Sequence, residues 1–350
     1  MWLADLTTPC LVLDKTKLER NAARMRARAA DLGVALRPHL KTAKCVNVAR
    51  IAHGGELGPI TVSTLREAEY FADNGYSDIL CAVCISPDKL ERAAAIAGLT
   101  VITDSAVVAA EINQPCLVEV DCGEGRTGVG RDAVQAIADV LGPHFRGVMT
   151  HGGHSYGCRT IDQIQGVAEQ ERASVADFPG AHMRSVGSTP TATHAQHLAG
   201  VTEMRPGVYL FGDLFQVSIH SCRIEDIACT VLATVTSHKP ERGQLMLDAG
   251  GLALSKDRST AKTSDLGYGL VCDDATGEPI GDLYVADVHQ EHGEVRSRSG
   301  AELPWERLEI GARVRIMPNH ICMTAAMYDR YHLVDGGEEV QAIWKRVNGW

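Results

Sequence analysis

The sequence lacks an excess of basic residues. Its 350 residues hold 34 Lys and Arg against 44 Asp and Glu, a formal net charge of −10. Binding to nucleic acid needs a basic face for the phosphates, so this balance argues against nucleic acid as a main partner. The chain also lacks an apolar run near the roughly 18 residues of a membrane span. Its start, MWLADLTTPC, has no basic stretch followed by an apolar run, so we expect no secretory signal.

The eleven cysteines lack the pattern of a disulfide framework. They are scattered, odd in number, and several fall in apolar runs such as PCLVEVD. Disulfide frameworks suit short secreted chains, so we expect reduced, mostly buried thiols in a cytoplasmic protein. The stretch CAVC at residues 81–84 has redox spacing. It lies inside an apolar run rather than at a strand-to-helix turn, which argues against a thioredoxin-like role.

The first 222 residues alternate short β-branched runs with longer Ala- and Leu-rich amphipathic segments. Strands are predicted at residues 11–13, 34–36, 60–63, 78–83, 100–103, 116–120, 145–150 and 183–186. Repeated strand–helix units imply a parallel sheet with right-handed crossovers, and about eight units in roughly 200 residues favour a closed (β/α)₈ barrel. No GxGxxG motif follows the first strand, which disfavours a Rossmann fold.

After residue 222 strand-like runs continue, but long helical segments stop. Turn sequences such as KPERG, DATGEP and RSRSG separate these runs. We therefore predict an α/β protein of two domains: a TIM-type (β/α)₈ barrel at residues 1–222 and a mostly antiparallel β-domain at residues 223–350.

The stretch RPHLKTAK, residues 37–44, places basic side chains directly after a predicted barrel strand. The carboxyl ends of barrel strands face the active site. A lysine that is partly desolvated there becomes a nucleophile toward carbonyl groups. Lys41 and Lys44 are both candidates, and two solvated lysines would explain the stretch equally well.

Two later loops have the composition of a phosphate site. Gly187, Ser188 and Thr189 follow the last predicted strand and precede a helix, and Gly207 lies in the next loop, RPGVYLFGD. Free backbone N–H groups at such a helix start bind phosphate, and barrels commonly bind phosphate after their last two strands. An ordinary turn would also explain either loop. A nucleophilic lysine and a phosphate site together suggest pyridoxal 5'-phosphate.

A third candidate site is PNHICMTAA, where His320 and Cys322 alternate along a predicted strand end. Imidazole and thiolate suit zinc, and two protein ligands would leave positions for water or substrate. A buried cysteine beside a core histidine is the stronger interpretation on spacing alone. His289 and His292 in HQEHG fit either further ligands or a solvated hairpin. THGGHSYG, residues 150–157, could contact a cofactor ring.

Taken together, these motifs resemble the D-serine dehydratase and D-threonine aldolase family of alanine-racemase-like pyridoxal phosphate enzymes. The resemblance covers essentially the whole chain, through TPCLVLD, RPHLKTAK, SVGSTPTA, TEMRPGVYLF, DAGGLALSKDR, QEHG and PNHICMTAA. It implies a homodimer that acts on a small D-amino acid.

The resemblance also implies roles for individual residues. Lys41 matches the lysine that binds the cofactor covalently, and Tyr156 matches a tyrosine near its pyridine nitrogen. Thr189, Gly207 and Val208 match phosphate-binding positions, and Arg126 matches an arginine near the phenolic oxygen. His320 and Cys322 match the ligands of a divalent metal, which is zinc in some relatives; manganese, cobalt and magnesium are the other candidates.

Cys322 separates two branches of this family. Aldolase members tend to have an aspartate two residues after the metal histidine, whereas a cysteine is typical of dehydratases. The resemblance therefore implies elimination of water from a 3-hydroxy-D-amino acid, such as D-threo-3-hydroxyaspartate or D-serine, to a 2-keto acid and ammonia. The alternatives are a D-threonine-type aldolase, a racemase, a non-catalytic pyridoxal phosphate homeostasis protein and a metabolic barrel without this cofactor.

Overall fold

The computed structural model describes all 350 residues, and they form two compact units. The barrel unit comprises Ala22–Tyr209, Ile219–Ser221 and Val347–Trp350. The β-unit comprises Met1–Asn21, Leu210–Ser218 and Cys222–Arg346. The predicted domain division was a single cut after residue 222, whereas each unit is built from several stretches of chain.

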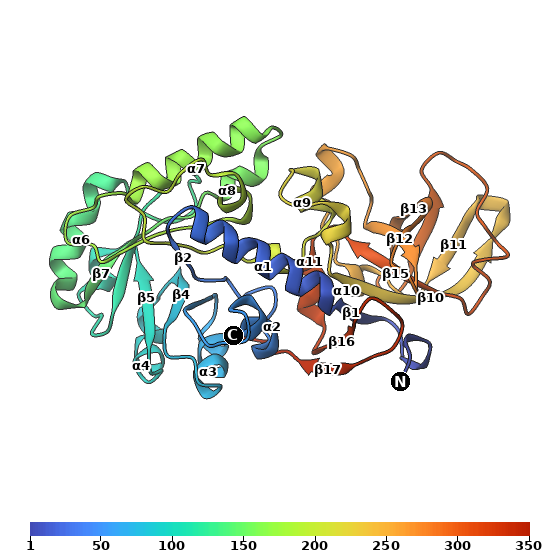
Figure 1. Ribbon diagram of the computed structural model, residues 1–350, viewed down its shortest axis with the longest axis horizontal. Helices are drawn as coiled ribbons and strands as arrows, with labels where there is room; N and C mark the ends of the chain where they lie inside the picture. Colours follow the sequence, from blue (N-terminus) through green and yellow to red (C-terminus); the bar gives the residue numbers. More distant parts are fainter. The chain divides into compact units, whose positions relative to one another are not determined.

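The barrel unit contains an eight-stranded parallel sheet with the strand order β2-β9-β8-β7-β6-β5-β4-β3. Strands β2, β4, β5 and β7 of this sheet are labelled in Figure 1. Backbone bonds from Leu40 N to the Thr61 carbonyl, 2.8 Å, and from Thr61 N to the Pro38 carbonyl, 2.9 Å, join the two ends of this order. The strands are β2 (Ala35–Leu36), β3 (Ile60–Val62), β4 (Ile79–Cys84), β5 (Leu99–Thr103), β6 (Cys116–Glu119), β7 (Phe145–Met149), β8 (Met183–Val186) and β9 (Glu203–Met204). The predicted barrel class is confirmed.

Helices alternate with these strands, and their ends follow the local sequence. They are α1 (Lys15–Asp31), α2 (Val46–Ala52), α3 (Leu65–Asp73), α4 (Leu90–Ala94), α5 (Ala106–Ala109), α6 (Val134–Leu141), α7 (Ile161–Val175) and α8 (Thr189–His194). Thr160 caps α7 by accepting from Gln163 N, while the Gln163 side chain bonds back to the Thr160 amide. This capping box satisfies two amides that the first turn leaves unpaired.

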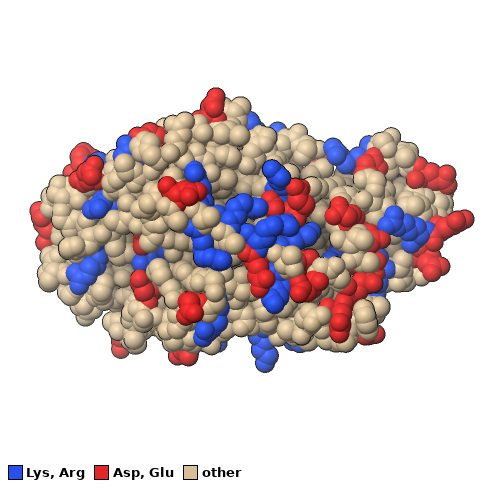
Figure 2. Space-filling view, viewed as in Figure 1, with Lys and Arg blue, Asp and Glu red and all other residues tan.

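Basic side chains gather over α1 on the face shown in Figure 2. Two arginines of α1 have structural partners. Arg26 Nη1 donates to the carbonyls of Ile51 and Ala52 at the end of α2, and Arg28 Nη2 donates to the carbonyl of Ala195 at the end of α8. Guanidinium groups stabilise the partial negative charge of helix C-termini. These arginines therefore fix neighbouring helices in place.

The strand predicted at residues 11–13 does not belong to the barrel. It forms β1 (Cys10–Asp14), which pairs with β10 and β16 in the β-unit. An apolar run of this length fits either sheet, so pattern alone could not assign it. The barrel strand that was not predicted is β9, because its two residues are too few to show a periodic pattern. RPHLKTAK therefore follows the first barrel strand, and β8 and β9 are the last two.

The β-unit has a nine-stranded sheet in the order β11-β14-β13-β12-β15-β10-β1-β16-β17, and a β11–β10 pairing closes six of these strands into a barrel. All pairs are antiparallel except β1–β16. The strands are β10 (Cys229–Lys239), β11 (Gln244–Leu247), β12 (Gly269–Asp273), β13 (Pro279–Val288), β14 (Gly293–Ser297), β15 (Arg313–Pro318), β16 (Arg330–Val334) and β17 (Ala342–Lys345); the short helices are α9 (Leu214–Ser218), α10 (Gly251–Leu254) and α11 (Ile321–Thr324). The predicted antiparallel β-domain is confirmed.

None of the eleven cysteines forms a disulfide, and six of them are buried. Burial raises the pKa of Cys81 to about 11 and that of Cys116 to about 12. Such thiols stay protonated near neutral pH and are poor nucleophiles. No helix combines the length and the apolar character that crossing a membrane requires.

Candidate active site

A cavity of about 350 Å³ lies in the barrel unit at the ends of β2, β4, β6 and β7. This volume falls within the range of small-molecule sites. Its charged or titratable lining residues are His39, Lys41, Cys84, Glu119, Arg126, His151 and Arg205.

The two lysines of RPHLKTAK have different surroundings. Lys41 is exposed and lines the cavity, and its backbone N–H donates to Nδ1 of His39 at 3.4 Å. Lys44 has a positive φ of 48° and places Nζ 3.0 Å from Oε1 of the buried Glu67. The structure thus distinguishes the candidates, because Lys44 is held in an ion pair while Lys41 faces the cavity.

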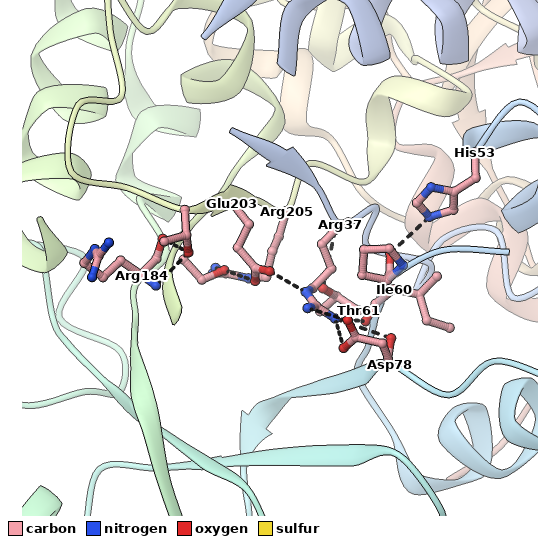
Figure 3. A network of polar contacts seen from close by, with 11 residues as sticks. Arg37, His53, Ile60, Thr61, Asp78, Arg184, Glu203 and Arg205 are labelled. Carbon is pink, nitrogen blue, oxygen red and sulfur yellow. Dashed lines mark hydrogen bonds and ion pairs between the residues drawn. The ribbon is translucent and has the colours of Figure 1, made fainter. Parts of the chain in front are cut away.

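Arg37, the first residue of RPHLKTAK, is buried and belongs to a network of polar contacts (Figure 3). Its Nε lies 2.8 Å from Oε2 of Glu203, and Nη1 and Nη2 lie 2.7 and 3.1 Å from the two carboxylate oxygens of Asp78. Both partners are carboxylates, so the guanidinium charge is neutralised within the barrel wall. Arg37 is therefore a structural residue.

The cavity lining carries more positive than negative charge. Lys41, Arg126 and Arg205 are cationic, and Glu119 is the only carboxylate in the lining. Burial, followed by the charge of Lys41, lowers the pKa of His39 well below its usual range and that of His151 to about 3. Both imidazoles are neutral at pH 7, so the three cations and one anion favour anionic ligands.

The predicted phosphate cup, defined as Gly187, Ser188, Thr189, Gly207 and Val208, lies in the loops after β8 and β9. Thr189 is buried and its Oγ1 has no hydrogen-bond partner. The other groups of its loop are engaged: Ser188 Oγ accepts from Thr191 N at 3.3 Å, and Gly187 N donates to Glu171 at 3.2 Å. A buried hydroxyl without a partner is costly, so this position fits a ligand oxygen.

Gly207 lies close to the loop that carries Lys41. A Cβ at Gly207 would fall 2.6 Å from the carbonyl oxygen of His39, and His39 N donates to the Pro206 carbonyl at 2.9 Å. Val208, which is buried, begins the next helical turn. The structure therefore brings the second phosphate loop and the lysine loop together.

Two further predicted residues lie in loops of the barrel unit. The rings of Tyr156 and His151 are 6.5 Å apart between centroids. Arg126 is half exposed in the loop after β6, with ion-pair distances of 3.4 Å to Glu124 and 3.9 Å to Glu119. These distances leave the guanidinium able to contact a ligand in the cavity.

The predicted metal ligands lie in the β-unit at the junction of β15 and α11. His320 directly precedes α11 and Cys322 lies within it, so they do not alternate along a strand as expected. Their side chains are nonetheless hydrogen bonded to each other. Nδ1 of His320 also lies 2.8 Å from Oδ2 of Asp257.

This cluster favours a positive charge. Burial opposes protonation of His320, but hydrogen bonds with Asp257 and Cys322 outweigh it and raise the pKa of His320 to about 11. Nitrogen and sulfur donors fit zinc or a similar divalent ion. No group of three or more His, Cys, Asp and Glu side chains converges on one point. Asp257 therefore serves as the partner of His320, an arrangement that orients metal-binding histidines.

His289 and His292 are exposed in the hairpin turn between β13 and β14. Several other residues were not singled out from sequence: Glu119, Glu171, Arg205 and Asp257. Asp257 lies in the motif DAGGLALSKDR, yet its spacing from His320 carries no pattern because the two come from distant parts of the chain. Only the fold brings them together.

Comparison with known proteins agrees with this architecture. Residues 13–214 match the family model of the alanine racemase N-terminal domain, and residues 228–334 match that of a serine dehydratase domain. The chain is 39% identical to D-threo-3-hydroxyaspartate dehydratase of Delftia sp. (strain HT23), over 99% of both chains. It is 32% identical to D-serine dehydratase of Dictyostelium discoideum, over 99% of this chain and 98% of that one.

A solved structure of D-threo-3-hydroxyaspartate dehydratase from Delftia sp. HT23 superposes with a TM-score of 0.93, at 38% identity over the whole of both chains. A variant of that enzyme with one cysteine replaced by alanine was solved in its metal-free form. Fold and site together define an alanine-racemase-like enzyme of the pyridoxal phosphate-dependent class. The chain belongs to the D-serine dehydratase and D-threonine aldolase family within that class.

Proposed function

We propose that the protein is a dehydratase dependent on pyridoxal 5'-phosphate and a divalent metal. It removes water from a 3-hydroxy-D-amino acid and releases a 2-keto acid and ammonia. The observation that carries this proposal is the placement of Lys41 on a cationic cavity while Lys44 is engaged by Glu67. The identity of 39% to a dehydratase over 99% of the chain supports it.

The cofactor site is assigned to residues of the barrel unit. Lys41 Nζ would hold the cofactor covalently, and the phosphate cup would bind its phosphate, with Thr189 Oγ1 supplying the hydroxyl that lacks a partner. Tyr156 and Arg126 are the further residues assigned to the cofactor, as the family resemblance implies. Pyridoxal phosphate, when bound, supplies an electron sink for the pair left when a bond at Cα breaks.

Lys41 Nζ would take the Cα proton of the substrate as a general base. The imidazoles of His39 and His151 are neutral at pH 7, so they add no positive charge beside the Lys41 amine. Arg126 and Arg205, which both line the cavity, add positive potential that favours an anionic substrate.

His320 and Cys322 are assigned as the protein ligands of the divalent metal, with Asp257 orienting His320. A divalent ion held there supplies Lewis acidity that makes the β-hydroxyl a better leaving group. Zinc suits this donor set best, because Cys and His are its preferred ligands.

The excess positive charge of the cavity favours a substrate with two carboxylates. We therefore place D-threo-3-hydroxyaspartate ahead of D-serine as the substrate.

Several apolar side chains of the β-unit are exposed. Among them, Leu252 lies in α10, and Met323 and Met327 follow the assigned metal ligands in sequence. Their exposure supports a homodimer, and the eleven free thiols support a cytoplasmic location.

Product analysis tests the reaction. With D-threo-3-hydroxyaspartate and D-serine we expect ammonia together with oxaloacetate or pyruvate. Glycine together with an aldehyde from D-threonine would identify an aldolase instead. Inversion of the configuration at Cα without release of ammonia would identify a racemase. Absence of turnover with bound cofactor would favour a homeostasis protein. Sedimentation velocity tests the dimer.

A further inference from the structure

One buried carboxylate joins two loops at the cavity end of the barrel unit. Glu171 lies in α7 and is 1% exposed. Its Oε1 accepts from Gly152 N at 2.5 Å and from Gly187 N at 3.2 Å. Gly152 belongs to the loop after β7, and Gly187 belongs to the loop after β8. A single oxygen therefore bridges the backbones of two separate loops.

We propose that Glu171 is a positioning residue, which holds these two loops in the arrangement that binds the phosphate of the cofactor. The proposal depends on the proposed function, because it takes the phosphate cup as the anion site. Glu171 does not line the cavity, so it acts through the loops rather than on a ligand.

Other bonds show that the two loops form one unit. The His151 imidazole donates through Nδ1 to the Gly187 carbonyl, and Ser155 Oγ lies 3.0 Å from Ser188 Oγ. Ser188 Oγ in turn lies 2.8 Å from Thr191 Oγ1. Thr191 is hydrogen bonded to the Glu171 side chain. These contacts join residues that lie on either side of Thr189 in the sequence, and the Thr189 hydroxyl is the buried group without a partner.

The packing leaves no room for the loops to shift toward α7. A Cβ at Gly152 would lie 2.8 Å from Cδ of Glu171 and 2.9 Å from Cγ1 of Val167. A Cβ at Gly187 would lie 3.0 Å from Cβ of Arg205. A side chain at Gly152 would therefore have to displace Glu171 or Val167, so the carboxylate sets how close this loop approaches α7, while Gly187 packs tightly against Arg205.

The charge of Glu171 and its hydrogen bonding can be separated. Burial raises the pKa of Glu171, while the bonds from Thr191, Gly152 and Gly187 and the charge of Arg205 offset part of this effect. A negative charge behind an anion site opposes binding, whereas the bridging oxygen favours it by fixing the loops. Glu171→Gln keeps an oxygen and removes the charge, and Glu171→Met keeps the length and removes both.

The test is titration of cofactor-free protein with pyridoxal 5'-phosphate, followed by the absorbance of the covalently bound form, and competition with inorganic phosphate. We expect E171M to weaken affinity for both ligands about tenfold, the effect of losing a bond to a charged acceptor. E171Q should bind at least as tightly as the parent protein.

D226N is the matched control, because Asp226 is a buried carboxylate that accepts the Arg223 amide at 3.0 Å in the β-unit. It should leave both affinities unchanged. If E171M does not fold, G152A disturbs the same contact from the loop side and should also weaken both ligands.

Unchanged affinities in E171M, or in G152A where E171M does not fold, would overturn the proposal. So would an E171Q that loses affinity as E171M does. Failure of the proposed function is distinguishable, since the parent protein itself would then form no covalent complex with the cofactor.

Discussion

Nδ1 of His320 lies 2.8 Å from Oδ2 of Asp257, although 63 positions separate them in the chain. This bond fixes which imidazole nitrogen remains for a metal, because a carboxylate keeps its neighbour protonated on the near side. The relationship makes Asp257 part of the proposed metal site even though it is not assigned as a ligand.

Replacement of Asp257 is expected to weaken metal binding. D257A should lower zinc affinity by about 10–100-fold, the usual effect of losing such a partner, and D257N should lower it less. Competition with a chromophoric chelator measures both. S259A is the control, because Ser259 bonds to the other carboxylate oxygen of Asp257. Equal affinity in D257A and the parent protein would contradict this role.

Removal of the metal should separate cofactor binding from elimination. We expect a chelator to abolish ammonia release while the absorbance of the bound cofactor persists, and zinc to restore the activity. C322A should behave like the chelated protein, whereas C272A removes a buried thiol of β12 and should retain metal. Elimination that continues in metal-free, cofactor-loaded protein would contradict the assigned role.

The Thr189 hydroxyl should contribute to cofactor affinity rather than to stability. Thr189→Val removes a hydroxyl that has no partner within the chain, so the free energy of unfolding should stay unchanged or rise. The loss of a bond to a phosphate oxygen should weaken cofactor affinity by about 1.5–3 kcal/mol, or roughly 10–150-fold. Thermal unfolding measures the effect on stability, and cofactor titration measures the effect on affinity. A destabilised T189V with unchanged cofactor affinity would contradict the assignment.

The buried imidazole of His151 should make the cofactor-free protein less stable in acid. Burial, then the charges of Lys41, Arg126 and Arg205, lower its pKa from 6.5 to about 3. As pH falls below 6.5 the unfolded chain gains a proton that the folded chain excludes, so the free energy of unfolding decreases. The decrease should reach about 2 kcal/mol between pH 6.5 and 5.

Urea unfolding of the parent protein and of H151N across this interval measures the effect. Asparagine keeps a donor for the Gly187 carbonyl but has no titrating group. The variant should therefore lose less stability on acidification, with His39 accounting for part of what remains. Parallel pH profiles for the two proteins would contradict the assignment of the effect to His151.

Local pattern was enough to predict the barrel class, because each strand–helix unit carries its own apolar period. It could not place the run at residues 11–13, since a short apolar strand fits either sheet. It also could not detect β9, a strand of two residues. Pairing with distant strands decides both cases, and such pairing leaves no trace in the local sequence.

In the candidate site, too, some residues could be predicted from local sequence and others could not. Lys41, Thr189 and His320 stand in compact motifs, so sequence could propose them. The sequence could not show which lysine of RPHLKTAK faces the cavity, because the ion pair between Lys44 and Glu67 forms only in the folded chain. Asp257 and Glu171 reach their partners only through the fold, so neither could be predicted from spacing.

In the proposed function the amine of Lys41 carries the cofactor. Borohydride reduction of the cofactor-loaded protein, followed by peptide mass analysis, identifies the lysine that is used. We expect one modified peptide, with the reduced cofactor on Lys41, and no modification in K41A. Fixation on Lys44 or any other lysine, or no fixation at all, would contradict it.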